Sequence, residues 1–155
     1  MGNKYTIFDV AKWFLGKESM THKKLQKLCY YAKAWSLVLT PENPFVFPFE
    51  AWVHGPVNRI LWDHLKGFGY CDITEENVPF KGKDIDEQTC DFLESVWNTY
   101  GEFTGFQLEN LTHSEEPWKN ARIGLGEFEP SSNVIKNKDM INFYGNLISG
   151  ESIGE

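Results

Sequence analysis

The clearest periodic pattern along the chain begins at Thr21. Apolar residues recur there at alternating spacings of three and four, which is typical of one face of a helix, and they are Leu25, Leu28, Ala32, Trp35 and Leu39. Four lysines fall mostly on the other face, namely Lys23, Lys24, Lys27 and Lys33. Pro41 and Pro44 then end the pattern. The pattern predicts a long helix with one side facing a core and a basic side facing solvent.

Shorter patterns, most of them opened by a capping residue and several closed by Gly, predict further helices. The predicted ranges are 6–15, 56–67, 86–101, 104–111, 114–122 and 137–148. In the range that begins at Pro56, the proline takes the first helical position, where its fixed φ is suitable and no N–H is needed.

Two segments are predicted to be extended. Residues 45–53 alternate apolar and polar positions around Pro48, which favours an edge strand, and residues 70–80 are irregular or form a short strand that could pair with it. Residues 124–133 are rich in Gly, Pro and Ser and predict a loop. The sequence therefore predicts a mainly α fold of five to seven helices with a small two-stranded β element. We expect a single compact domain over residues 1–149 and a frayed tail over residues 150–155.

The charge of the chain is unevenly distributed. Its 155 residues carry a formal net charge of -7, which argues against a nucleic-acid-binding protein that works through bulk positive charge. The first 40 residues nevertheless hold seven lysines and only two acidic residues. This difference predicts a bipolar molecule, with a basic side suited to an acidic partner and an acidic side suited to a basic one.

The chain has no long apolar run, no paired cysteine pattern and no metal-ligand spacing, and these features bear on its location and metal content. Apolar runs are too short for a membrane helix, and the three cysteines, Cys29, Cys71 and Cys90, suggest neither a disulfide framework nor a zinc ribbon. The spacings of the four histidines match no familiar ligand set. We expect a cytoplasmic protein without membrane contact, metal or cofactor.

The segment Phe49–Val57 is the most unusual in the chain. If a helix begins at Pro56, then Trp52 and His54 are presented just before a helix N-terminus, whose free N–H groups can receive an anion or an acidic side chain. The alternative is a structural corner in which Trp52 belongs to the core and Gly55 permits the turn.

A second cluster of polar and aromatic residues runs from Thr112 to Arg122. His113 could pair with a carboxylate as a general base, or it could make a purely structural hydrogen bond. Arg122 is spaced to reach Trp118 or Glu115.

Three ordered motifs between Met20 and Arg122 resemble the Panacea domain of SocA-like, phage-associated antitoxins. The first motif is the run Met20–Ala32 followed by Trp35, and the second is the segment Phe49–Val57. The third combines Leu111, Thr112 and His113 with Pro117 and Trp118. His54 stands where that family usually has an aromatic residue or His, which is a mild departure.

The resemblance implies a small, mainly helical protein without enzymatic activity, found in bacteria, phages and mobile elements. It also implies a partner, namely a toxin encoded by a neighbouring gene, which the protein binds and neutralises. One branch of the family is a proteolytic adaptor that delivers its toxin to a AAA+ protease. Motif or toxin-interface candidates are Lys23, Lys24, Lys27, Tyr30, Tyr31, Trp35, Trp52, His54, Gly55, Pro56, Val57, Thr112, His113, Trp118 and Arg122.

Two other functions compete with the antitoxin hypothesis. A small hydrolase or nucleotide-binding enzyme would use His54, His113 and nearby carboxylates. A nucleic-acid-binding regulator would use the lysine face of the long helix, helped by Tyr30 and Tyr31. The sequence leaves open the identity of the toxin, the face that binds it and the oligomeric state.

Overall fold

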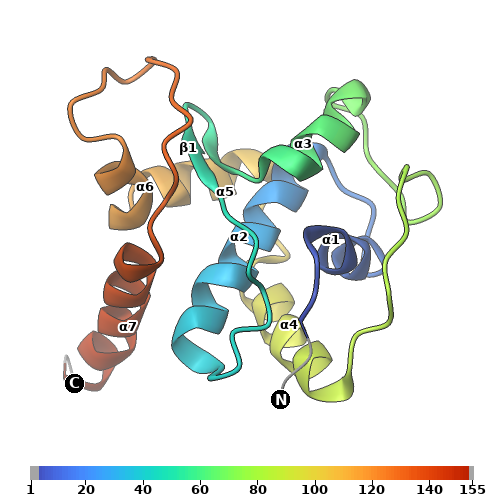
Figure 1. Cartoon of the computed structure of the whole chain (residues 1–155), viewed down its shortest axis with the longest axis horizontal. Coiled ribbons are helices and arrows are strands. Elements are labelled where there is room, and N and C mark those ends of the chain that lie inside the picture. Colours follow the sequence, from blue (N-terminus) through green and yellow to red (C-terminus); the bar gives the residue numbers. More distant parts are fainter. Residues whose placement is uncertain (1–3, 154–155) are drawn as a thin grey trace.

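A long central helix organises the fold, as the periodic pattern predicts. The computed structural model describes residues 4–153, and in it α2 (His22–Leu39) packs against α1 (Ile7–Leu15), α4 (Glu87–Tyr100), α5 (Gly105–His113) and α7 (Asn137–Ile153). Figure 1 shows α2 between α7 on one side and α1 and α4 on the other. The described residues also form α3 (Arg59–Leu65), a 3-10 turn (Lys66–Phe68) and α6 (Glu116–Ala121). The predicted mainly α fold, with five to seven helices in a single compact domain, is confirmed.

Most helices begin at the capping residues that the sequence indicates. The side chains of Thr6, Thr21, Asp86 and Thr104 each accept a hydrogen bond from the backbone N–H three residues further on. The Thr6 backbone N–H in turn donates to the Asp9 side chain, and the Thr104 N–H donates to the Gln107 side chain. Both helix starts are therefore capping boxes. These local bonds explain why the predicted starts were correct.

The β element is a tight hairpin, which differs from the prediction. β1 (Glu50–Trp52) pairs antiparallel with β2 (Gly55–Val57), and Ala51 faces Pro56. Pro56 is therefore a strand residue, and the predicted helix start there is wrong. Helix α3 begins after Asn58, whose side chain accepts from the Leu61 N–H. In this two-stranded sheet Pro56 lies on an edge strand, where its missing N–H breaks no ladder bond.

Residues 70–80 do not pair with the hairpin, contrary to one of the predicted alternatives. Ile73 instead exchanges two backbone hydrogen bonds with Met20, just before α2. The hairpin is extended on its other side by Val134, which forms a bridge with Glu50, while the Ala51 N–H donates to Asn133. A segment that follows the predicted loop 124–133 therefore completes the sheet.

The predicted basic, solvent-facing side of α2 is wrong in part. Lys27 and Lys33 are buried, and their ammonium groups donate to the backbone carbonyls of Pro56 and Phe47. The reason is tertiary, because α2 is enclosed by elements on several sides and its middle turns have no free face. Lysine tolerates such a position since its long stem is apolar and its head finds an acceptor.

Helix α7 starts at Asn137 as predicted but continues to Ile153, beyond the predicted end at Ile148. The last two residues of the predicted tail, 154–155, lie outside the described residues. Within the part of the chain that the structure describes, no helix has the length and apolarity needed to cross a membrane.

Candidate functional site

The second motif forms a hairpin that rests on the first and third motifs. Gly55 has a φ of +107°, which disfavours any side chain, and a Cβ built on it would lie 2.6 Å from Cε of Lys27 and 3.1 Å from Oγ1 of Thr112. Only glycine fits between α2 and α5 in this geometry. The Gly-Pro step of the second motif is thus explained by close packing of the three motifs.

Lys27 is the buried base beneath this hairpin. Its Nζ donates to the Pro56 carbonyl at 3.2 Å, and its side chain is almost wholly inaccessible. Burial lowers the pKa of Lys27 to about 7, although nearby Glu109 opposes this shift and Lys23 adds to it. The Lys27 amine therefore changes its protonation state near pH 7.

The third motif holds the hairpin from its other side. The Trp118 indole N–H donates to the Trp52 carbonyl at 2.8 Å. The buried Arg122 guanidinium donates to the backbone carbonyls of Ala51 at 2.9 Å and of Glu129 at 2.6 Å. Arg122 also lies over the Trp118 ring at 5.2 Å, as the spacing predicted. These bonds tie β1, α6 and the loop that follows α6 into one unit.

The aromatic residues of the first motif serve an internal network rather than the surface. The Tyr31 and Tyr144 hydroxyls both donate to Oε1 of buried Glu115 at 2.8 Å, and Tyr31 stacks on Tyr100. Burial raises the pKa of Glu115, which the two hydroxyls oppose. Trp35 joins the network through its indole N–H, which donates to the Tyr100 hydroxyl.

His54 is paired with a carboxylate that the sequence motifs did not indicate. Its Nδ1 lies 3.0 Å from Oε2 of Glu109, whose other oxygen accepts from Lys23. Burial raises the pKa of Glu109, but the bonds from Lys23 and His54 outweigh it and leave that pKa below its ordinary value. Glu109 stays ionised, and it orients both basic side chains.

The general-base hypothesis expected His113 to pair with a carboxylate, but among the described residues no hydrogen bond joins His113 to one. Its ring stacks on Trp118 at a centroid distance of 4.1 Å, and its buried Nε2 has no hydrogen-bond partner among the described residues. Burial lowers the pKa of His113, partly opposed by Glu109. The hydrogen-bonded histidine–carboxylate pair of this surface is therefore at His54 instead.

A cavity of about 500 Å³ opens between the hairpin and the starts of α2 and α5. Beside it, a second hollow of about 520 Å³ lies between the hairpin, α3 and residues 130–132, and the two share one wall. That wall is formed by Trp52, His54, Val57 and Trp62. The rings of Trp52 and Trp62 meet edge to face with centroids 5.2 Å apart. We call the two hollows and this wall the hairpin groove.

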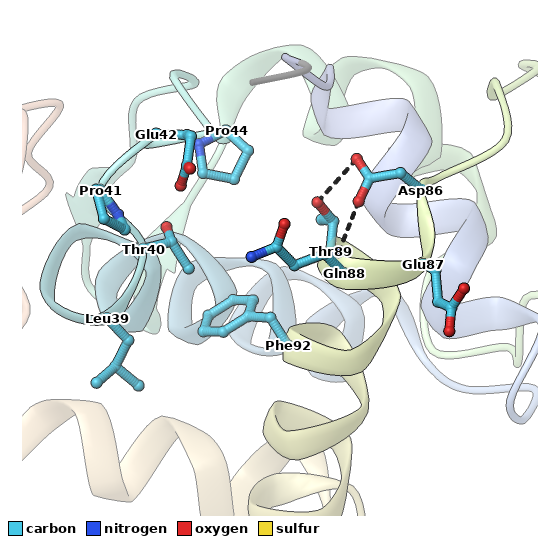
Figure 2. Close-up of a pocket in the computed structure, with 10 residues that line it drawn as sticks. All are labelled: Leu39, Thr40, Pro41, Glu42, Pro44, Asp86, Glu87, Gln88, Thr89 and Phe92. Carbon is cyan, nitrogen blue, oxygen red and sulfur yellow. Dashed lines mark hydrogen bonds between the residues drawn. The ribbon is translucent and has the colours of Figure 1, made fainter. Parts of the chain in front are cut away.

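Another hollow, of about 430 Å³, lies at the opposite end of α2 (Figure 2). Its lining includes the apolar residues Leu39 and Phe92 and the acidic residues Glu42, Asp86 and Glu87. Figure 2 shows Asp86, the N-cap residue of α4, with its carboxylate accepting hydrogen bonds from Thr89. No motif residue lines this hollow, so the candidate site is at the hairpin groove.

Comparison with known families identifies the domain. Residues 25–119 match the family model for the antitoxin SocA-like, Panacea domain. The chain belongs to this family. No curated protein and no solved structure matched the chain.

The matched Panacea segment covers the hairpin and the third motif, whereas Thr21–Lys23 at the cavity precede it and Arg122 and α7 lie beyond it. Within the chain's candidate set, the structure exposes His54 and leaves Lys23, Lys24, Trp35, Trp52, His113 and Trp118 partly exposed. It buries the others, namely Lys27, Tyr30, Tyr31, Gly55, Pro56, Val57, Thr112 and Arg122. Buried motif residues build and hold the hairpin groove.

Several residues of the groove region are absent from the candidate set, and four of them matter most to its walls and charge. Trp62, Tyr70 and Phe106 line the cavity, and Glu109 pairs with Lys23 and His54. The spacing of Glu109, three residues before Thr112 on one helix face, was an available signal. Tyr70 had none, since it follows a 3-10 turn and reaches the cavity only through the tertiary fold.

Proposed function

We propose that the protein is an antitoxin that binds and neutralises a cognate toxin by direct protein–protein contact. Membership of the SocA-like antitoxin family supports this function. The observation that carries the proposal is the hairpin groove, in which motif residues Trp52 and His54 stand beside a cavity on a firmly held hairpin.

The groove has the properties of a protein interface. Aromatic side chains such as Trp52 and Trp62 provide most of the binding energy in many interfaces when they lie in pockets. The hydrogen bonds from Trp118 and Arg122 fix the hairpin before binding, so little conformational entropy is lost on association. We infer a stoichiometric, non-catalytic action, in which protection follows from occupancy of the toxin.

Co-expression tests this function. The product of the neighbouring gene should arrest growth when expressed alone, and this chain should restore growth and co-purify with that product in a fixed ratio. Titration of purified toxin should give protection that saturates at one equivalent per binding site, whereas a catalyst would protect at far lower amounts. A harmless neighbouring product, or no complex with it, would contradict the proposal.

The same experiment separates blocking from proteolytic delivery. Under direct blocking, the amount of toxin in the cell stays constant while growth recovers. An adaptor for a AAA+ protease would instead make the toxin disappear, and a strain without the protease would regain the toxicity. We expect the toxin to persist in the complex.

A further inference from the structure

We propose that Lys27 is a site of covalent modification, at which its amine condenses with a small uncharged aldehyde that enters the cavity between the hairpin and the starts of α2 and α5. Lys27 is one of the residues that line this cavity. Such a site belongs to the isolated protein, whether or not the protein neutralises a toxin. The proposed function and this inference can therefore fail separately.

The Lys27 amine is held between α2 and the hairpin. It donates to the Pro56 carbonyl at 3.2 Å, and a Cβ on Gly55 would lie 2.6 Å from its Cε and 3.3 Å from its Nζ. Lys27 is 2% exposed, so a reagent reaches it through the cavity that it lines. Within residues 4–153 the amine has a neutral carbonyl as its acceptor and forms no ion pair. These contacts do not require a charged nitrogen.

The groups around Lys27 leave much of its amine neutral. Burial lowers the pKa of Lys27 to about 7, Glu109 opposes this shift, and Lys23 adds to it. Glu109 is bonded to Lys23 and His54, and burial lowers the pKa of His22 to about 4, so that His22 is neutral. About half of the Lys27 amine is therefore neutral at pH 7. A neutral lysine amine in an apolar pocket is the form that attacks carbonyl groups.

The condensation consumes no oxidant and no reductant. The amine lone pair bonds to the aldehyde carbon, and a proton moves from nitrogen to oxygen to give a carbinolamine. The C–O bond then breaks, the second nitrogen proton leaves with the oxygen as water, and an imine remains. His54 lines the same cavity, with Nδ1 bonded to Glu109 and its side chain 71% exposed. The other ring nitrogen of His54 can carry the proton between nitrogen and oxygen.

The cavity favours an aldehyde with an uncharged apolar group. Its walls include the rings of Trp52, Trp62, Tyr70 and Phe106. An apolar group on the aldehyde would cover these rings and release their water. Among the described lining residues, Lys23 and His54 are bonded to Glu109 and His22 is neutral, so a charged aldehyde finds no unpaired cation there beside the reacting amine.

Reductive labelling of the whole protein tests the site. Benzaldehyde is the probe, sodium cyanoborohydride converts the imine to a stable secondary amine, and peptide mass spectrometry locates the adduct. Lys33 is the matched control, because it is buried and bonded to a carbonyl but lines neither the hairpin groove nor the hollow of Figure 2. At pH 7 we expect Lys27 to react before Lys33 and before exposed Lys138.

Two results of this labelling would overturn the proposal. Lys33 or Lys138 could react as fast as Lys27, which would show that the cavity selects no amine. Glyoxylate, an aldehyde that carries a carboxylate, could label Lys27 faster than benzaldehyde, which would refute the uncharged class of substrate.

Trace acetylation with acetic anhydride separates protonation from access. At pH 7 protonation alone leaves about five times more neutral amine at Lys27 than at Lys33, because their pKa values are about 7 and about 8. Near pH 10 this factor falls to about one. We expect Lys27 to remain the faster amine near pH 10, since it alone of the two lines the cavity. Equal rates there would show that the cavity gives no access and would overturn the proposal.

His54→Gln tests the proton transfer. We expect labelling of Lys27 by benzaldehyde to slow by about 100-fold, the lower end for a positioned acid–base group, while acetylation stays unchanged because it releases no water. His64→Gln, exposed on α3 and outside the cavity, is the control and should react like wild type. Circular dichroism checks the fold of both variants. An equal loss of acetylation in His54→Gln would assign His54 to packing and contradict the proton transfer.

Discussion

At the scale of single residues, the buried lysines depart furthest from the expected pattern. Lys27 and Lys33 each give an ammonium hydrogen bond to one backbone carbonyl, and burial lowers the pKa of Lys27 to about 7 and that of Lys33 to about 8. A buried ammonium with a single acceptor is costly to keep charged, so these groups couple folding to pH.

Lys27 makes the stability of the protein depend on pH in a predictable direction. The unfolded chain keeps the Lys27 proton up to about its ordinary pKa of 10.5, whereas the folded chain releases it near 7. The unfolded state therefore binds more protons between these pH values, and the free energy of unfolding rises with pH by up to about 1.4 kcal/mol per unit. Urea unfolding at several pH values above 7 measures this slope.

Lys27→Met should remove the part of the rise in the free energy of unfolding that begins near pH 7. Lys33→Met is the matched comparison and should remove only the part that begins near pH 8, since the pKa of Lys33 is lowered less. If Lys27→Met keeps the wild-type slope between pH 7 and 8, the assignment of the proton to Lys27 is wrong.

At the scale of elements, the hairpin depends on a helix far away in sequence. β1 and β2 have only three residues each, and an isolated hairpin of this size is at most marginally stable in water. The Arg122 guanidinium supplies bonds to Ala51, Gly126 and Glu129, so one side chain fixes both the hairpin and the loop after α6.

Arg122→Met should loosen this unit. The substitution keeps an apolar stem but leaves three carbonyls without their donor, which should lower the free energy of unfolding by about 2–4 kcal/mol. Hydrogen exchange should accelerate at the Ala51 and Ile135 amides, which donate to the carbonyls of Asn133 and Phe49. Arg59→Met, which breaks an exposed ion pair with Glu50, is the control and should leave these amides protected. Unchanged protection of the Ala51 and Ile135 amides in Arg122→Met would show that Arg122 does not hold the hairpin in place.

Helix α7 lies beyond the segment that matches the family and still completes its core. Met140 and Tyr144 are fully buried against α2, and the Tyr144 hydroxyl satisfies Glu115 together with Tyr31. A buried carboxylate without such donors would be unfavourable. The domain of this chain therefore needs α7, although the family pattern ends before it.

At the scale of the whole molecule, the basic first quarter does not become a basic surface. Six of its seven lysines bond to carbonyls or carboxylates elsewhere among residues 4–153. Besides Lys23, Lys27 and Lys33, these are Lys4, Lys17 and Lys24. Lys4 donates to the carbonyls of Glu42 and Asn43, Lys17 to the Glu94 carboxylate and Lys24 to the Gly101 carbonyl. Tyr30 and Tyr31, which were expected to support nucleic-acid binding, are buried. These six lysines thus bond within the fold, and the whole chain keeps its net charge of -7.

This arrangement predicts that the protein does not bind nucleic acid. Phosphate contacts dominate such binding and are strongest at low salt, but six of the seven lysines in the first 40 residues already bond within the fold. Fluorescence anisotropy with labelled duplex DNA at low salt should show no binding, and the isolated toxin and its complex provide the comparison. Salt-dependent binding by this chain alone would contradict the prediction.

The sequence by itself determined the helices, because their caps and apolar spacings are local. Thr6, Thr21, Asp86 and Thr104 accept from amides three residues further on, so the starts of α1, α2, α4 and α5 could be predicted without knowledge of the fold. The three motifs also indicated the family, since their order and residue types lie within the chain itself.

Only the tertiary structure decided how these residues act. The hairpin at Gly55 depends on contacts with Lys27 and Thr112, the burial of Lys27 depends on the elements that enclose α2, and the pairing of His54 depends on Glu109. Each of these contacts joins residues more than 25 positions apart, and no local propensity encodes such a distance. The candidate surface arises where three distant motifs meet, because their side chains satisfy one another only there.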